Sequence, residues 1–177
     1  MFDFFSLETY QGVQEWIIAN PTWAGLVVFT LAMSESLAVV GLFIPGFVVM
    51  GIVGGLISAE VLELVPTLLW AIAGAVVGDG VSYYIGHYFK EQLPHVWPFR
   101  RFPQWLERGK KFFIDHGGKS IVIGRFVGPV RPFIPVVAGM MNMKPRNFLV
   151  ANVLSAIIWA PVYMLPGFSI AQLVSLT

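Results

Sequence analysis

The sequence predicts an all-α integral membrane protein, in which an N-terminal interfacial helix precedes two inverted re-entrant helical hairpins, each followed by a transmembrane helix. Three observations predict this class. Of the 177 residues, 56% are apolar and only 12% are charged, whereas roughly a quarter of the residues in a soluble domain are charged. The longest apolar stretch exceeds the roughly 20 residues that cross a bilayer, and prolines and glycines interrupt the apolar stretches. All eleven lysines and arginines lie from Lys90 onward, while residues 1–86 hold seven acidic residues and no basic ones.

Residues 1–21 are expected to form an amphipathic segment at the membrane surface. Apolar residues between Leu7 and Ile18 follow helical spacing, with polar residues between them. The pair Asn20 and Pro21 ends this helix. The segment contains no basic residue, which does not fit a cleaved signal peptide, so we expect it to remain in the mature protein.

Residues 22–89 are expected to form the first hairpin and its transmembrane helix. The apolar run from Trp23 to Ile57 is too long for one straight span, and Pro45 with Gly46 breaks it into an entering and a returning segment. After a polar turn, residues 66–89 predict a transmembrane helix, which we expect Gly78-Asp79-Gly80 to interrupt.

Residues 90–119 form a basic amphipathic segment between the two apolar halves. From His87 to Lys119 the sequence holds seven basic and three acidic residues, and the positive-inside rule places it in the cytoplasm. A basic surface between two membrane segments is more typical of contact with anionic lipid than of nucleic acid binding.

Residues 120–177 are expected to form the second hairpin and a final transmembrane helix over residues 148–165. The apolar run Ile121–Met143 contains three prolines that exclude a regular spanning helix. They are Pro129, Pro132 and Pro135. Because basic residues flank this run on both sides, a hairpin that enters and leaves on the cytoplasmic side satisfies the positive-inside rule.

The two halves resemble each other around their prolines. Phe-Ile-Pro at residues 43–45 is followed by two valines and a glycine, and so is Phe-Ile-Pro at residues 133–135. Since the first hairpin would open outside and the second inside, the halves would be inverted repeats, as in many secondary transporters with broken helices.

Two arginines in the second apolar run are the first candidate functional residues. Arg125 and Arg131 lie beside Gly124 and Gly128, whose small size lets a lipid headgroup approach the backbone. A guanidinium costs free energy within a membrane segment and usually faces a cavity with a partner. Its planar set of donors matches phosphate oxygens, which predicts a phosphate-bearing ligand. The alternative is that each arginine pairs permanently with a buried carboxylate.

Glu35 and Asp79 are the only acidic residues well inside apolar stretches. A buried carboxyl group next to an arginine is able to exchange a proton with its surroundings, so these two are candidates for proton coupling. The alternatives are a helix cap for Asp79 and a fixed arginine counter-ion for Glu35. The sequence predicts no metal site and no cofactor, and no serine or cysteine nucleophile with its partners, so we expect no enzymatic activity.

The motifs resemble those of a known family. The run GRFVGPVRPFIP at residues 124–135, followed by Ala-Gly at residues 138–139, is similar to the signature of the DedA superfamily of membrane proteins. Residues 35–46, from a glutamate to Phe-Ile-Pro-Gly, and residues 78–86, from Gly-Asp to a tyrosine and a glycine, resemble its other two motifs.

This resemblance implies a multi-pass protein of the bacterial inner membrane that returns undecaprenyl phosphate or a related lipid across the bilayer. In the family, the arginines matched by Arg125 and Arg131 are implicated in function and phosphate binding, and the acid matched by Glu35 in proton coupling. The family often has a second acid where this chain has Phe47, which leaves either Asp79 as its substitute or uncoupled transport.

The end of the sequence resembles versions fused to a phosphatase of the phosphatidic-acid-phosphatase type. The ten residues after Gly167 are too short to span the membrane by themselves. We therefore expect either a fused or associated phosphatase domain, or a homodimer.

Three functions follow from the sequence. The first is a flippase for a polyprenyl phosphate or a related anionic phospholipid, with proton coupling. The second is an uncoupled lipid scramblase, and the third is a non-transporting module that presents lipid to a membrane phosphatase.

Overall fold

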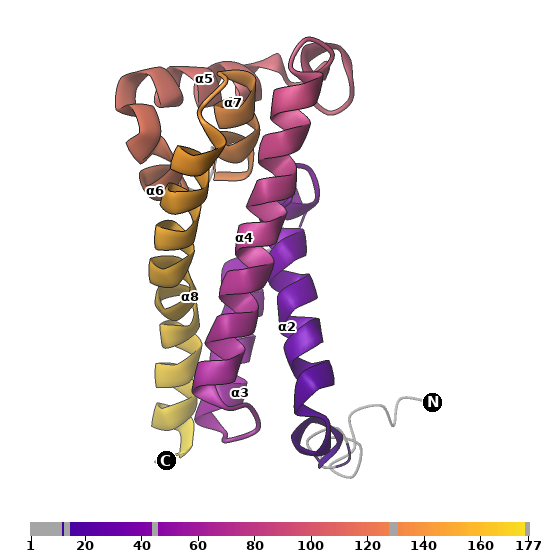
Figure 1. Ribbon diagram of the computed structural model, residues 1–177. Coiled ribbons are helices and arrows are strands. Elements are labelled where there is room, and N and C mark those ends of the chain that lie inside the picture. Colours follow the sequence, from indigo (N-terminus) through magenta and orange to yellow (C-terminus); the bar gives the residue numbers. More distant parts are fainter. Residues whose placement is uncertain (1–11, 13–14, 44–45, 128–130, 176–177) are drawn as a thin grey trace.

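The computed structural model describes residue 12 and residues 15–43, 46–127 and 131–175, and within them the chain is helical without any strand (Figure 1). The α-helices are α2 (Pro21–Ser36), α3 (Gly46–Ser58), α4 (Leu64–Phe89), α5 (Pro103–His116), α6 (Ser120–Gly124), α7 (Ile134–Met140) and α8 (Pro145–Ser175). Four single 3-10 turns lie between them: η2 (Val40–Leu42), η3 (Leu93–His95), η4 (Gly117–Lys119) and η5 (Arg131–Phe133). Of the predicted interfacial segment, the described residues 15–19 are helical, and Asn20 separates them from α2.

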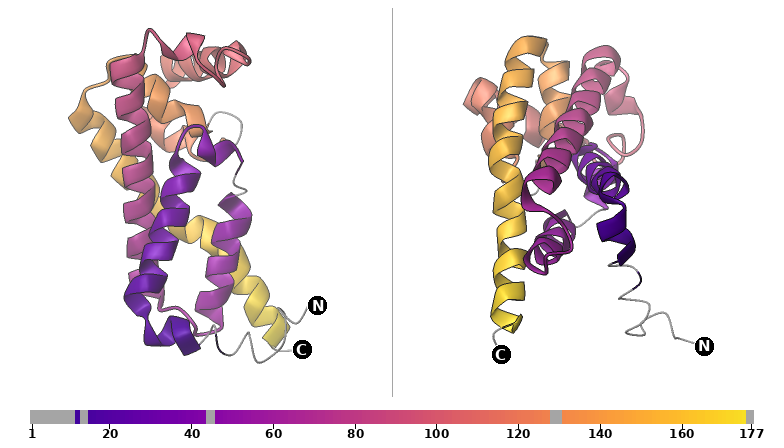
Figure 2. Two further views of the ribbon diagram at one scale, coloured as in Figure 1. Left: turned by 90° about the vertical axis from the view of Figure 1, so that its right-hand side faces the viewer. Right: turned by 60° about the horizontal axis from the view of Figure 1, so that its bottom comes forward.

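Helices α2 and α3 form the first hairpin, which opens at the lower end of the molecule and has its tip inside the bundle (Figure 2). The predicted break is confirmed, because α2 ends at Ser36 and α3 begins at Gly46; Pro45 itself lies outside the described residues. Gly46 leaves room for Glu35, since a methyl group at this position would overlap the side chain of Glu35 on α2.

Helix α4 runs from the lower to the upper end of the bundle without a break (Figure 1). The predicted interruption at Gly78–Gly80 is therefore wrong. The glycines serve packing instead: at Gly74 and Gly78 a methyl group would overlap the backbone of α2, so these positions allow the two helices to touch. Asp79 lies within the helix and is not a helix cap.

The second hairpin is formed by α6, η5 and α7 and opens at the upper end of the molecule (Figure 1). Pro132 lies in η5, and Pro135 lies in the first turn of α7, where the missing N–H of proline leaves no helical hydrogen bond unmade. Gly128 and Pro129 lie outside the described residues.

Helix α8 is longer than predicted. It starts at Pro145, passes through Pro161 and Pro166, and continues to Ser175. Residues 168–175 are therefore the last turns of α8 and not a separate short segment. A methyl group at Gly167 would overlap the backbone of Gly51, so α8 and α3 are in close contact there.

Each of the two long helices packs against one helix of each hairpin. Helix α4 packs against α2 of the first hairpin and α7 of the second, while α8 packs against α3 of the first and α6 of the second. Each long helix thus contacts both hairpins. Among the described residues, α4 and α8 are the helices long and apolar enough to cross a membrane.

The predicted basic segment contains η3, α5 and η4 and lies across the upper end of the bundle (Figure 1). Helix α5 is amphipathic and turns Leu106 and Gly109 toward α7. Its basic residues Arg108 and Lys111 are exposed. The second hairpin therefore rests against a helix whose outer face is polar and charged.

Candidate functional site

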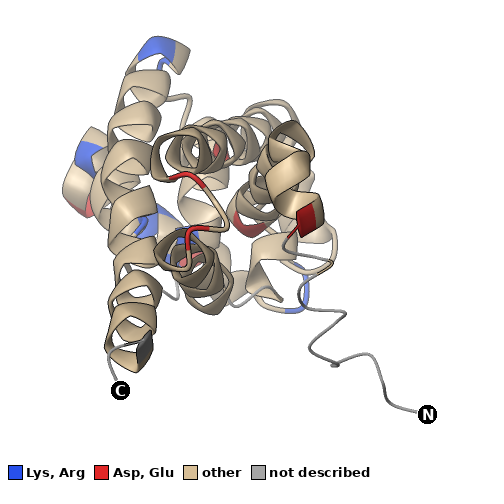
Figure 3. Cartoon of the chain, turned by 90° about the horizontal axis from the view of Figure 1, so that it is seen from below, with Lys and Arg blue, Asp and Glu red and all other residues tan. Residues whose placement is uncertain are grey.

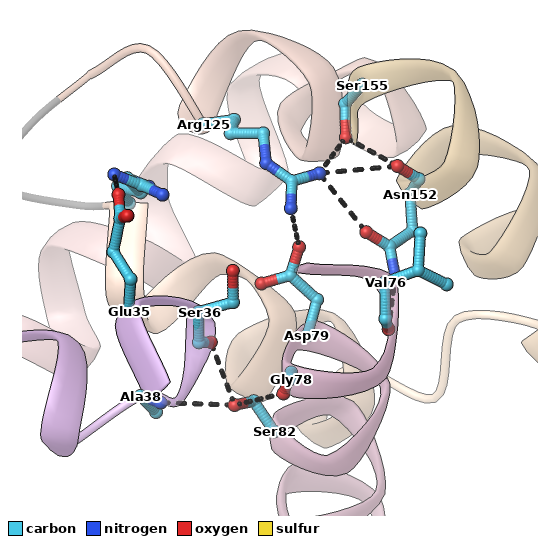
Figure 4. Close-up of polar contacts among 11 residues, drawn as sticks. Glu35, Ser36, Ala38, Val76, Gly78, Asp79, Ser82, Arg125, Asn152 and Ser155 are labelled. Carbon is cyan, nitrogen blue, oxygen red and sulfur yellow. Dashed lines mark hydrogen bonds and ion pairs between the residues drawn. The ribbon is translucent and has the colours of Figure 1, made fainter. Parts of the chain in front are cut away.

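Arg125 follows the last residue of α6 and is 4% exposed. Its Nη2 atom pairs with a carboxylate oxygen of Asp79 on α4 at 2.6 Å. Its Nη1 atom donates to the Ser155 hydroxyl at 2.6 Å and lies 3.3 Å from both oxygens of Asn152 on α8 (Figure 4). The guanidinium thus ties the second hairpin to both long helices.

Asn152 completes this network. Its side-chain nitrogen donates to the backbone oxygen of Val76 on α4 at 3.1 Å, and the Ser155 hydroxyl donates to the backbone oxygen of Asn152 at 2.8 Å. Because Asn152 and Ser155 are three residues apart, one face of α8 presents both of them to α4 and Arg125. Each of these polar groups therefore has a defined partner in the interior of the bundle.

Arg131 and Glu35 form a second ion pair, between Nη1 and Oε1. Glu35 lies near the end of α2, at the tip of the first hairpin, and Arg131 begins η5, at the tip of the second. The two hairpin tips are therefore joined by opposite charges. In the view from below, blue and red positions lie both within the outline of the helices and at its edge (Figure 3).

The two ion pairs differ in their exposure and in how many of their polar atoms have hydrogen-bond partners. The side chain of Arg131 is 15% exposed, against 4% for that of Arg125. The Nη2 atom of Arg131 and the Oε2 atom of Glu35 are buried and have no hydrogen-bond partner among the described residues. The hairpin-tip pair thus keeps unused donor and acceptor capacity, which a bound ligand would be able to occupy.

Both arginines lie close to the same aromatic ring. The guanidinium carbons of Arg125 and Arg131 lie 5.4 Å and 5.2 Å from the centre of the Trp159 ring, within the range of cation–π attraction. Tyr163, one turn further along α8, lies 5.2 Å from Arg131. Trp159 is completely buried, and its indole nitrogen has no hydrogen-bond partner among the described residues.

A buried hydroxyl positions the tip that carries Glu35. The Ser82 hydroxyl on α4 accepts a hydrogen bond from the backbone N–H of Ala38 at 3.1 Å. The same oxygen lies 3.3 Å from the backbone oxygen of Ser36 and 3.0 Å from that of Gly78 (Figure 4). The end of α2 is therefore fixed to α4 directly after Glu35.

The structure brings together the four charged residues that the sequence singled out, as two ion pairs whose arginines both lie within cation–π distance of one indole. Gly124 is buried against the side chain of Ile134, so it packs the hairpin. Gly128 lies outside the described residues. The pairing also satisfies the alternative in which each arginine has a carboxylate partner, and it leaves phosphate binding as a prediction.

Sequence reasoning missed Ser82 on α4 and four residues of this site on α8. One of these four, Trp159, is completely buried. The signal for the others is polarity at helical spacing within an apolar segment: residues 152, 155, 159 and 163 recur every three or four positions and mark one face of α8. They are Asn152, Ser155, Trp159 and Tyr163.

Comparisons with known proteins agree with the motifs. A family model described as the VTT domain matches residues 44–169. Protein DedA of Escherichia coli (strain K12) is 38% identical over 82% of this chain and 68% of its own length. The inner membrane protein YabI of the same strain is 35% identical over 88% of this chain and 61% of its own length.

An uncharacterized membrane protein of Buchnera aphidicola subsp. Baizongia pistaciae (strain Bp) is 36% identical over 85% of this chain. The match covers 59% of that protein, so this chain spans less than two thirds of the length of such relatives. No solved structure shows a significant match.

Proposed function

Because this chain belongs to the VTT domain family, the family of the membrane protein DedA, we propose that it moves a lipid phosphate of the polyprenyl phosphate class between the leaflets of the bacterial inner membrane. The observation that carries the proposal is one buried and one half-buried arginine beside the same indole, each paired with a carboxylate. A guanidinium in a membrane segment costs about 3 kcal/mol or more, which makes a purely passive role for two of them expensive.

Arg131 is the primary phosphate-binding residue of the proposal. Its guanidinium offers a planar fork that matches two oxygens of one phosphate, and its Nη2 atom has no hydrogen-bond partner among the described residues. A phosphate at this position competes with the Glu35 carboxylate for the same donors. The lipid phosphate then replaces the Glu35 carboxylate as the partner of Arg131.

Proton coupling follows from the charge balance of this exchange. When phosphate replaces the carboxylate on Arg131, Glu35 is left buried and charged unless it takes up a proton. Each negative phosphate that enters the site therefore favours the uptake of one proton. Asp79 and Arg125 repeat the arrangement deeper in the bundle, and Asp79 supplies the second acid that Phe47 does not provide.

The position of the pair at the hairpin tips gives a route for movement. Glu35 and Arg131 belong to hairpins that open at opposite ends of the molecule. Exchange of the ion pair for a phosphate loosens the contact between the tips, and rocking of one repeat against the other would expose the phosphate to either side. In this proposal the hairpins are re-entrant in the bilayer.

Phe47 supports an uncoupled scramblase as the second candidate function. Its ring lies edge-on against Tyr163, with ring centres 5.7 Å apart, and Tyr163 contacts Arg131. An apolar ring at this position lines the site without offering a proton acceptor. Lipid would then move down its gradient, whatever the pH on either side.

The test is transport in liposomes of purified protein. A short-chain polyprenyl phosphate is placed in one leaflet, and its appearance in the other is followed with and without a pH gradient. The key variant is Glu35→Gln with Arg131→Gln, which removes both charges, keeps a polar amide at each position and leaves neither charge without its partner. The control is Arg100→Gln at the exposed basic end.

We expect movement that responds to the gradient in the wild type and the control, and none in the folded double variant. Movement that ignores the gradient supports the scramblase. Lipid binding without movement supports a module that presents lipid to a membrane phosphatase. Wild-type transport in the double variant would refute every version in which this pair binds phosphate.

A further inference from the structure

A shallow groove with a volume of about 580 Å³ lies on the molecule where η4 and α6 meet the first turns of α8. The rim of the groove is basic and its floor is apolar. His116, Lys119 and Arg146 line the rim. Val122, Val150 and Leu154 line the floor.

The basic rim has no acidic side chain to balance it. Lys119 and Arg146 are both exposed, and neither forms an ion pair with an acidic residue among the described parts of the chain. Lysine and arginine side chains at the same end of an apolar helix attract the anionic headgroups of the adjoining leaflet. The rim therefore has the charge that a phosphate group requires.

The apolar floor continues along the outer face of α8. Val150 and Leu154 are each 54% exposed, although they lie in a helix long and apolar enough to cross a membrane. A free phosphate ion would use only the rim, whereas a lipid would place an acyl chain along the floor and cover exposed apolar surface. The combination fits an amphipathic ligand.

The groove faces away from the two buried ion pairs. On α8, Asn152 and Ser155 point toward Arg125, whereas Val150 and Leu154 point outward. A lipid in the groove would therefore occupy a site separate from the arginine pair, and its binding does not depend on transport.

We infer that the groove between η4, α6 and α8 binds one anionic phospholipid of the leaflet at the basic end of the molecule, which the positive-inside rule places in the cytoplasm. The phosphate lies at Lys119 and Arg146, and one acyl chain follows Val150 and Leu154. The lipid fastens the start of α8 to the second hairpin from outside.

Native mass spectrometry of the full chain with phosphatidylglycerol tests this site. The variant Lys119→Gln with Arg146→Gln removes the rim charge, and Arg100→Gln with Arg108→Gln is the matched control, with the same loss of charge from exposed positions outside the groove. We expect affinity for the first bound lipid to fall about tenfold or more in the rim variant and to stay within about twofold in the control, since each basic residue near a phosphate contributes appreciably. Equal loss in both variants, or no loss in the rim variant, would overturn the inference.

Two further arms separate lipid from phosphate and the groove from the central site. Val150→Trp fills the exposed floor and should weaken phosphatidylglycerol binding, and inorganic phosphate at millimolar concentration should not displace the lipid. The double variant Glu35→Gln with Arg131→Gln should keep the groove lipid even if transport is lost. Loss of the first bound lipid in that variant would place it at the arginines and refute the groove site, while leaving the transport proposal intact.

Discussion

Replacement of Asp79 by leucine tests whether its ion pair with Arg125 holds the bundle together. In Asp79→Leu the guanidinium keeps its bonds to Ser155 and Asn152 but loses its counter-charge in a site where Arg125 is 4% exposed. Removal of one partner from a buried ion pair destabilises a protein by about 3–5 kcal/mol. We expect the free energy of unfolding of Asp79→Leu to fall by about 3 kcal/mol, the lower limit, because the other hydrogen bonds remain.

Arg125→Leu and the double variant, Asp79→Leu with Arg125→Leu, complete a double-mutant cycle. Arg125→Leu leaves the Asp79 carboxylate buried and unpaired, with a similar cost of about 3 kcal/mol. In the double variant no charge remains, and the main loss is the hydrogen bonds to Ser155 and Asn152, about 1–2 kcal/mol. The coupling energy between the two sites is then about 4 kcal/mol.

Unfolding in mixed micelles, followed by the loss of helical circular dichroism, measures all four proteins. The expected order of stability is wild type, then the double variant, then the two single variants. Additive losses, with the double variant least stable of all, would show that the ion pair has no coupling energy and would refute the reasoning.

Two further predictions concern the contacts between α4 and the first hairpin. Gly74→Ala should destabilise the protein by about 1–3 kcal/mol because the new methyl group meets the backbone of α2, whereas Gly80→Ala in the same helix has open space and should be neutral or slightly stabilising, as measured by the same unfolding assay. Ser82→Ala should cost about 1–2 kcal/mol and lower the rate of lipid transport in liposomes, because the N–H of Ala38 next to the hairpin tip loses its acceptor. Thr30→Ala is its control, with an expected cost below about 0.5 kcal/mol, since the Thr30 hydroxyl is exposed and donates its hydrogen bond within α2. Equal effects of Ser82→Ala and Thr30→Ala would contradict the positioning role of Ser82.

The sequence predicted the hairpin breaks well because prolines and glycines have local effects on the backbone. The break before Gly46 and the irregular run around Pro132 appear where the residues indicated them. Glycine has no such fixed meaning in an apolar helix, so the predicted interruption at Gly78–Gly80 failed. There the missing side chain allows close contact with α2, which no pattern within α4 alone reveals.

The sequence identified the charged residues of the site but not the α8 residues that surround them. A charged residue in an apolar run is conspicuous, so Arg125 and Arg131 stood out by composition alone. The pairing of each arginine with its carboxylate depends on how α4 crosses the hairpins, and the sequence alone does not reveal this crossing. Trp159 looked like one more apolar aromatic residue, and only the packing of α8 places both guanidinium groups on its ring.

The two ion pairs would have different roles in the proposed transport. Arg125 has its charge balanced and its donors engaged by residues of both long helices, so exchange of its partner would break several bonds at once. Within the part of the chain that the structure describes, Arg131 has one carboxylate partner, two aromatic rings and a nitrogen without a hydrogen bond, so its carboxylate is replaceable at much lower cost. If phosphate exchanges at Arg131 while Arg125 keeps the bundle assembled, the coupling energy measured for Glu35 and Arg131 should be smaller than that for Asp79 and Arg125. The pair with the weaker coupling should then be the one whose neutral replacement abolishes transport and leaves the fold intact.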